Sequence, residues 1–172
     1  MQVKIKKLVG NAVIPVYALE GDGAQDLTAI SKKYDEFGNI HYGTGLAFAI
    51  PKGYVGLLFP RSSNAKKDLI LSNSVGVLDS NYRGEVSFKF KPSVVLYDNI
   101  GIAPQGKLGI DDSPFTDIVV PTIRYGLELQ DYEIGDRIGQ IVILPYPKIE
   151  FLEVSDLDET NRGAGGYGST GK

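Results

Sequence analysis

The chain has 172 residues, with 18 Lys and Arg against 21 Asp and Glu, a formal net charge of −3, no Cys and one His. This composition excludes disulfides, thiolate nucleophiles, Cys-ligated zinc and multi-His metal sites within one chain, so any metal is expected to be a hard cation held by oxygens, such as Mg²⁺. The mild negative charge argues against a broad nucleic-acid surface, which needs many Lys and Arg contacts to phosphates.

In chain order, short apolar or alternating runs stand between turn residues, a pattern typical of a single all-β domain. The first seven residues alternate apolar and basic side chains without the apolar core of a signal peptide, and no stretch approaches the ~20 apolar residues of a membrane span. We therefore expect a cytoplasmic protein that does not enter a membrane. The predicted strands are 3–5, 12–16, 45–50, 54–59, 69–71, 76–78, 86–91, 94–97, 118–123 and 137–145.

These strands suggest a β-sandwich, a jelly roll or a small barrel, with one or two helical turns around 62–68 as the best helical candidate. The clean alternation of 86–91 predicts one core face and one wet face. His41 is expected in a hairpin turn over 37–43, as a surface histidine.

Two segments differ from the rest of the chain. Residues 98–126 are rich in Gly, Pro and Asp and are interpreted as an excursion from a domain that spans 1–154. Residues 155–172 are first acidic and then Gly-rich, so this tail is expected to be mobile until something binds it. It is either a flexible linker or a flap that closes over a nucleotide, because it combines Arg162 with hydroxyl side chains, freed backbone amides and an aromatic ring.

Three short blocks admit both a structural and a functional reading. Ser62 and Ser63 either cap a helical turn, with Arg61 as a solvated surface residue, or form an anion site together with Arg61. Asp136 and Arg137 read as a surface ion pair, with Gln140 beside them as a candidate phosphate or water contact. Asp26 is either a turn residue or a carboxylate that lies beside a bound metal ion.

The block from 73 to 85 holds more chemistry than a hairpin and its turn require. A carboxylate at Asp79 can accept a proton from water, the ring of Tyr82 can pack on a sugar, and the amide of Asn73 can pair with a base edge. The block is thus read either as a plain β-hairpin or as part of a nucleotide site.

Taken in order from Asp26 to Gly171, these blocks and the tail resemble the five motifs of the trimeric dUTP pyrophosphatase (dUTPase) family. The most specific stretches are Pro-Arg-Ser-Ser at 60–63, Gly-Val-Leu-Asp-Ser-Asn-Tyr-Arg-Gly at 76–84, Gly-Asp-Arg-Ile-Gly-Gln at 135–140 and the Arg- and Gly-rich run at 162–171. The resemblance implies an all-β, jelly-roll-like barrel subunit and a homotrimer with three shared active sites. It also implies Mg²⁺-dependent hydrolysis of dUTP to dUMP and pyrophosphate.

Carried over by position, the resemblance makes Asp79 the base that activates the water attacking the α-phosphorus. It places Tyr82 on the deoxyribose and Asp26 on the Mg²⁺ shell through water. The uracil would be read by Asn73 with the backbone of Val77 and Leu78. The phosphates would be held by Arg61, Ser62, Ser63 and Gln140, and the tail would contribute Arg162, Tyr167, Gly168, Ser169 and Thr170.

Two features depart from the family pattern. The residues before Asp26 are Gly23-Ala24-Gln25 rather than the family's usual Ala-Gly followed by a hydrophobic or aromatic residue. The chain between the third and fourth motifs is longer by roughly thirty residues, a length that marks functional or disordered loops. Phage members of the family carry an insert there, which favours a phage or prophage source, and the segment 98–126 is a candidate surface for a protein partner.

Two rival functions remain open at this stage. A dCTP deaminase shares the fold and an Arg-Ser-Ser block, and its action would release ammonia from dCTP. A nucleotide-gated regulatory protein would bind dUTP and use 98–126 to contact another protein.

Overall fold

The computed structural model describes residues 1–93, 96–97, 124–125 and 129–165 of the chain. Within these ranges the elements are β1 (Lys4–Lys7), β2 (Gln25–Thr28), β3 (Ser31–Tyr34), β4 (Ile40–Gly43), β5 (Leu46–Ala49), β6 (Tyr54–Phe59), the 3₁₀ turn η1 (Ser62–Lys66), β7 (Leu69–Leu71), β8 (Gly76–Leu78), β9 (Ser87–Pro92), β10 (Leu96–Tyr97), β11 (Arg124–Tyr125) and β12 (Arg137–Pro145). The fold is all-β and jelly-roll-like, as the sequence pattern predicts.

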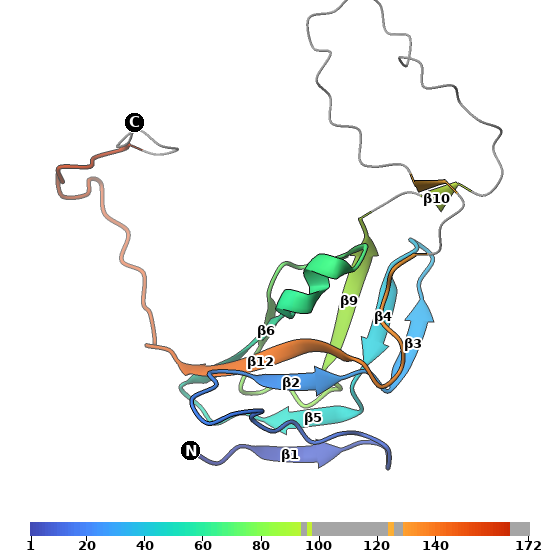
Figure 1. Cartoon of the computed structure of the whole chain (residues 1–172). Helices are drawn as coiled ribbons and strands as arrows, with labels where there is room; N and C mark the ends of the chain where they lie inside the picture. Colours follow the sequence, from blue (N-terminus) through green and yellow to red (C-terminus); the bar gives the residue numbers. More distant parts are fainter. Residues whose placement is uncertain (94–95, 98–123, 126–128, 166–172) are drawn as a thin grey trace, which may run out of the picture.

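Two four-stranded sheets form the body of the molecule (Figure 1). One has the strand order β2-β12-β6-β8 and the other β3-β4-β9-β7, while β1 pairs with β5, and β10 with β11. Strands far apart in the sequence therefore lie side by side, since β12 separates β2 from β6. This order brings the ends of β2, β6 and β12 together, where several of the motif residues lie.

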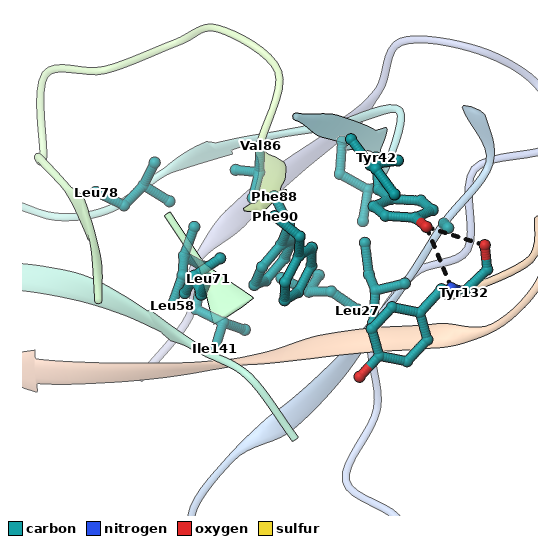
Figure 2. Close-up of a cluster of buried hydrophobic side chains, with 14 of the residues drawn as sticks. Leu27, Tyr42, Leu58, Leu71, Leu78, Val86, Phe88, Phe90, Tyr132 and Ile141 are labelled. Carbon is teal, nitrogen blue, oxygen red and sulfur yellow. Dashed lines mark hydrogen bonds between the residues drawn. The ribbon is translucent and has the colours of Figure 1, made fainter. Parts of the chain in front are cut away.

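Both sheets contribute side chains to one apolar core (Figure 2). Leu27, Leu58 and Ile141 come from the first sheet, and Phe88 and Phe90 from the second. The alternation predicted for 86–91 is confirmed, because Val86, Phe88 and Phe90 are buried and the residues between them are exposed. Burial of large apolar side chains of this kind is the main favourable term in folding.

Several predicted elements are confirmed. Strands occur at 54–59, 69–71, 76–78 and 137–145, and η1 is the expected helical turn. Of the predicted strand 94–97, residues 96–97 form β10 and residues 94–95 lie outside the described residues, as does the strand predicted at 118–123. No helix in the described part of the chain is long and apolar enough to cross a membrane.

The strand predicted at 12–16 is wrong. This segment has no strand partner and runs over the surface with Val13, Ile14 and Val16 exposed. Pro15 lies within it, and proline has no N–H with which to join a strand ladder. The apolar run that suggested a strand is therefore a surface segment.

The position predicted for His41 is also wrong, because this residue lies in β4, opposite Lys33 of β3 and Lys89 of β9. The turn occurs earlier, where the carboxylate of Asp35 accepts hydrogen bonds from the backbone N–H groups of Phe37 and Asn39 at 3.0 and 2.9 Å. These bonds close the β3–β4 hairpin and let the strand begin at Ile40. The sequence pattern did not indicate β2, β3 or β4.

Candidate active site

Polar side chains gather where β2, β12 and β6 lie next to one another. In the sheet register Gln140 of β12 pairs with Asp26 of β2 on one side and with Phe59 of β6 on the other. Arg61 follows the end of β6, and the register of β12 shifts between Arg137 and Gly139, as in a β-bulge. Three separate motifs are thereby brought into one cluster, which we call the arginine cluster: Asp26, Arg61, Ser62, Arg137 and Gln140.

Asp26 joins the two arginines of this cluster. Its Oδ1 lies 2.7 Å from Nε of Arg61, and its Oδ2 lies 3.1 Å from Nη1 of Arg137. The side chains of Asp26 and Arg61 are only 22% and 25% exposed, so this pair is partly shielded from water, whereas Arg137 is 56% exposed. The surface pair expected between Asp136 and Arg137 is wrong, because Asp136 instead accepts a 2.9 Å bond from the N–H of Glu133.

The arginine cluster lines a pocket of about 570 Å³, to which Asp22 and Gly23 also contribute. Ser62 and Ser63 do not cap η1, since its N-cap is Arg61 and no side chain bonds there. Ser63 Oγ instead accepts a 3.3 Å bond from Arg61 Nη1. Two guanidinium groups, a hydroxyl and an amide facing one pocket suit a ligand with several phosphate oxygens.

A second group of motif residues lines a different pocket, of about 200 Å³, which we call the Asp79 pocket. Asp79 and Tyr82 lie in it with Asn73, Val77 and Leu78, and so does Glu85, which no sequence pattern marked as a site residue. Val77 is 65% exposed and Tyr82 46%, so both side chains are free to contact a ligand. A carboxylate, a phenol ring and an amide that line one pocket suit a water, a sugar and a base.

The predicted hairpin around Asn73 is wrong in one respect. β7 pairs with β9 in one sheet and β8 pairs with β6 in the other, so residues 72–75 cross between the two sheets. The crossing is tight, since Ser74 has a φ of 59° and its N–H bonds to the carbonyl of Leu71 at 3.0 Å. The backbone of Val77 and Leu78 is thus part of a sheet edge rather than of an isolated hairpin.

The arginine cluster and the Asp79 pocket share no lining residue. Leu78 pairs with Gly56 near the start of β6, whereas Arg61 follows the end of that strand. The five residue steps from Gly56 to Arg61 correspond to roughly 16 Å at the rise of an extended strand. Within one copy of the chain, Asp79 therefore lies toward the start of β6 and Arg61 beyond its end, while Leu58 of β6 also lines the Asp79 pocket.

The segment after β12 extends away from the two sheets (Figure 1). Arg162 lies on it, with its Nε bonded to the carbonyl of Gly165 at 3.1 Å, and contacts neither group. Tyr167, Gly168, Ser169 and Thr170 lie outside the described residues. The described site residues thus fall into two separate groups, the arginine cluster and the Asp79 pocket, and Arg162 belongs to neither.

In the described ranges, no group of three or more His, Cys, Asp or Glu side chains could by itself hold a metal ion. The pocket of the arginine cluster has two carboxylates, Asp22 and Asp26. Oxygen ligands of this kind suit Mg²⁺, which usually keeps several waters and takes one or two carboxylates with substrate phosphates. The residues present therefore fit a Mg²⁺ ion that a bound phosphate chain would carry.

Comparison with known proteins places these motifs in a family. Residues 11–94 match the family model described as dUTPase. A deoxyuridine 5'-triphosphate nucleotidohydrolase of Wolinella succinogenes is 36% identical over 174 aligned positions, which cover 100% of this chain and 95% of the relative. The enzyme of that name from Escherichia phage T5 is 36% identical over 74% of this chain and 66% of its own length.

Among solved structures, the dUTPase of Staphylococcus bacteriophage 80alpha with dUPNHPP superposes with a TM-score of 0.66 at 25% sequence identity and covers 99% of both chains. The structural match thus covers almost all of the chain, and more than a third of the aligned residues are identical in the bacterial relative. The chain belongs to the dUTPase family.

Proposed function

We propose that this protein is a dUTP diphosphatase, which hydrolyses dUTP to dUMP and pyrophosphate. The observation that carries the proposal is the presence of the two kinds of groups that the reaction needs. One copy of the chain offers arginines for a phosphate chain in the arginine cluster, and a carboxylate beside a ring and an amide in the Asp79 pocket. Phosphoryl transfer needs mainly positioning and neutralisation of charge, and this chain supplies both without Cys and with one His.

In the Asp79 pocket we assign the base and sugar contacts. The Asn73 amide and the backbone of Val77 and Leu78 read the uracil edge, and the Tyr82 ring packs on the deoxyribose and leaves no room for a 2′-hydroxyl. The Asp79 carboxylate accepts a proton from a water molecule, whose oxygen attacks the α-phosphorus in line. The bond from the α-phosphorus to the bridging oxygen breaks, and pyrophosphate leaves with the electron pair.

In the arginine cluster we assign the phosphate contacts to Arg61, Ser62 and Gln140, and beside the cluster to Ser63, whose Oγ bonds to Arg61. The Asp26 carboxylate holds the guanidinium of Arg61 in place and would contact the Mg²⁺ shell through water. When bound, Mg²⁺ would neutralise charge on the phosphate chain. Arg162 and the tail residues Tyr167, Gly168, Ser169 and Thr170 are proposed to close over the γ-phosphate and the base.

We further propose that the active sites form between copies of the chain in a homotrimer. The arginine cluster and the Asp79 pocket share no lining residue, and Asp79 and Arg61 lie toward different ends of β6, so a second copy would supply the group of the other kind. The segment after β12 also exposes Phe151 at 92%, Leu152 at 85% and Leu157 at 85%. Apolar side chains exposed along one segment are typical of a surface that another chain covers.

The test is a pyrophosphate-release screen of dUTP, dTTP, dCTP and UTP with and without Mg²⁺. We expect release from dUTP that depends on Mg²⁺ and exceeds the release from the other three nucleotides. Ammonia release from dCTP would instead identify a deaminase. Binding of dUTP without turnover would favour a nucleotide-gated regulatory protein that contacts its partner through 98–126.

A further inference from the structure

The loop from Asp79 to Glu85 is anchored at its far end to the β4–β5 connection, forty residues earlier in the chain. Oε1 of Glu85 accepts a 2.8 Å hydrogen bond from the backbone N–H of Gly45. The next residue is held by the same connection, because the carbonyl of Val86 accepts bonds from the N–H and the hydroxyl of Thr44 at 3.2 and 2.6 Å. The Val86 bonds fix the start of β9, and the Glu85 bond fixes the residue before it.

The β4–β5 connection is shaped to receive this carboxylate. A Cβ atom at Gly43 would lie 2.6 Å from Glu85 Oε1 and 2.4 Å from Ser31 Oγ, so the carboxylate occupies space that only a glycine leaves open. Gly45, the donor, has a φ of +65°, a conformation that side chains rarely adopt. Gly43 thus leaves space for the Glu85 carboxylate, and Gly45 donates the hydrogen bond that holds it.

Glu85 in turn holds Tyr82. The phenol hydroxyl of Tyr82 donates a 3.1 Å bond to the main-chain carbonyl of Glu85, and the N–H of Tyr82 donates a 3.1 Å bond to the carbonyl of Asp79. The ring lies against Gly84, where an added Cβ would come within 2.4 Å of the hydroxyl oxygen. The position of the ring therefore depends on residues 84 and 85, and residue 85 is fixed to the scaffold by its side chain.

We propose that Glu85 is a positioning residue for sugar selectivity: its carboxylate, seated on Gly45, fixes the ring of Tyr82 against the sugar of the nucleotide. The inference rests on the proposed function, in which that ring excludes a 2′-hydroxyl. Removing the carboxylate leaves β9 and the Val86 bonds in place, including the bond from the Val86 N–H to the Leu46 carbonyl, which still holds the Glu85–Val86 peptide group. The loop from Asp79 to Glu85 loses its side-chain anchor on Gly45, so the ring of Tyr82 gains freedom within that loop while the fold persists. A looser ring admits ribose more readily, and this lowers the preference for dUTP over UTP.

The test compares Glu85→Ala, Glu85→Asp and Glu85→Gln with the wild type, using kcat and KM for dUTP and for UTP. Glu36→Ala is the matched control, because Glu36 is exposed in the β3–β4 turn and its carboxylate has no hydrogen-bond partner among the described residues. We expect Glu85→Ala to lower the dUTP/UTP ratio of kcat/KM by about tenfold, mainly through the KM values of the two nucleotides. Glu85→Asp should have the same effect, because its shorter side chain does not reach Gly45. Gln, whose amide oxygen can still accept from Gly45, should retain most of the ratio.

A purely structural role would reduce activity on both nucleotides by the same factor and leave the ratio unchanged, which would overturn the inference. Failure of Gln to restore the ratio would overturn it as well. If Glu85→Ala does not fold, the dUTP/UTP ratios of Glu85→Asp and Glu85→Gln test the proposal. Should the wild type release no pyrophosphate from dUTP, the proposed function fails, and the dissociation constants of dUMP and UMP for the same variants then test Glu85 separately.

Discussion

The Nε atom of Arg61 lies 2.7 Å from Oδ1 of Asp26, in a pair that links the end of β6 to β2. Each side chain is about three-quarters buried, so the guanidinium is held in one orientation at the edge of the pocket. A hydrogen bond between charged groups in such a setting contributes more than an exposed surface pair. Asp26 thus has a structural partner in the protein itself, whatever it contributes to a metal ion.

Replacing Asp26 with Asn should weaken substrate binding. The amide keeps the size of the side chain but loses its charge toward Arg61 and Arg137. We expect KM for dUTP to rise about tenfold, with a smaller fall in kcat. Steady-state kinetics at several Mg²⁺ concentrations measure both effects, and a raised half-saturating Mg²⁺ concentration is expected if Asp26 contacts the metal shell. A KM equal to that of the wild type would contradict the role in orienting Arg61.

Replacing Asp79 with Asn should separate binding from turnover. The amide fits the same space but cannot take a proton from water, so kcat should fall by about 10²- to 10⁴-fold. Binding of dUTP, measured by calorimetry, should remain within a few-fold of the wild type. Asp156→Asn, in the exposed segment after β12, is the control and should keep full activity. A near-normal kcat for Asp79→Asn would remove the residue from the chemical step.

Ending the chain after Asn161 tests the tail. Residues 162–164 are exposed and contribute nothing to the core, so the thermal unfolding midpoint should not change. Activity should fall more than tenfold, because the truncation removes Arg162 and the ring of Tyr167, and stacking on a base contributes ~1–3 kcal/mol. Thermal unfolding followed by a pyrophosphate assay checks both parts. A fully active truncated protein would exclude the tail from the site.

Tyr42→Phe tests a buried contact that holds the segment after β11 to the core. The Tyr42 hydroxyl donates a 3.0 Å bond to the carbonyl of Tyr132 and accepts a 3.2 Å bond from its N–H (Figure 2). Burial raises the pKa of the Tyr42 phenol, so it stays protonated and able to donate. Its removal leaves two backbone groups without partners and should cost about 1–3 kcal/mol of unfolding free energy.

Urea unfolding of Tyr42→Phe measures this loss, with Tyr34→Phe as the control. The hydroxyl of Tyr34 is exposed and makes a long 3.4 Å contact to Asp131, so its removal should change stability by less than about 0.5 kcal/mol. Equal losses in the two variants would show that the buried bonds to Tyr132 are not the cause.

The Asp35 turn predicts how stability depends on pH. The side-chain amide of Asn39, aided by the backbone N–H groups of Asn39 and Phe37 and by Lys89, holds the pKa of Asp35 well below its usual range. A lowered carboxyl pKa stabilises the fold above the unfolded-state value of about 4 and loses that contribution as the pH falls further. Asp35→Ala should therefore be less stable at pH 7 and lose less stability than the wild type between pH 4 and 2. Urea unfolding at both ends of that range tests this, and parallel losses in the two proteins would contradict it.

The sequence by itself determined the family motifs, the all-β class and the local geometry of several segments. The alternation of 86–91 is enough to assign its buried face, because the two-residue period of a strand is a local property. The motif residues Arg61, Asp79 and Tyr82 were likewise visible without a structure, since their order along the chain is specific to the family. Short strands without apolar alternation, such as β2 and β3, could not be predicted from the sequence, because their formation depends on partners elsewhere in the chain.

Only the tertiary structure decided which of these residues meet. Arg137 pairs with Asp26, 111 residues away, rather than with its neighbour Asp136, because the register between β12 and β2 sets the contact. Glu85 acquires a role only when the β4–β5 connection is brought beside it. Such partners are chosen by strand order and register, which depend on the packing of the whole core, and no local pattern around either residue specifies them.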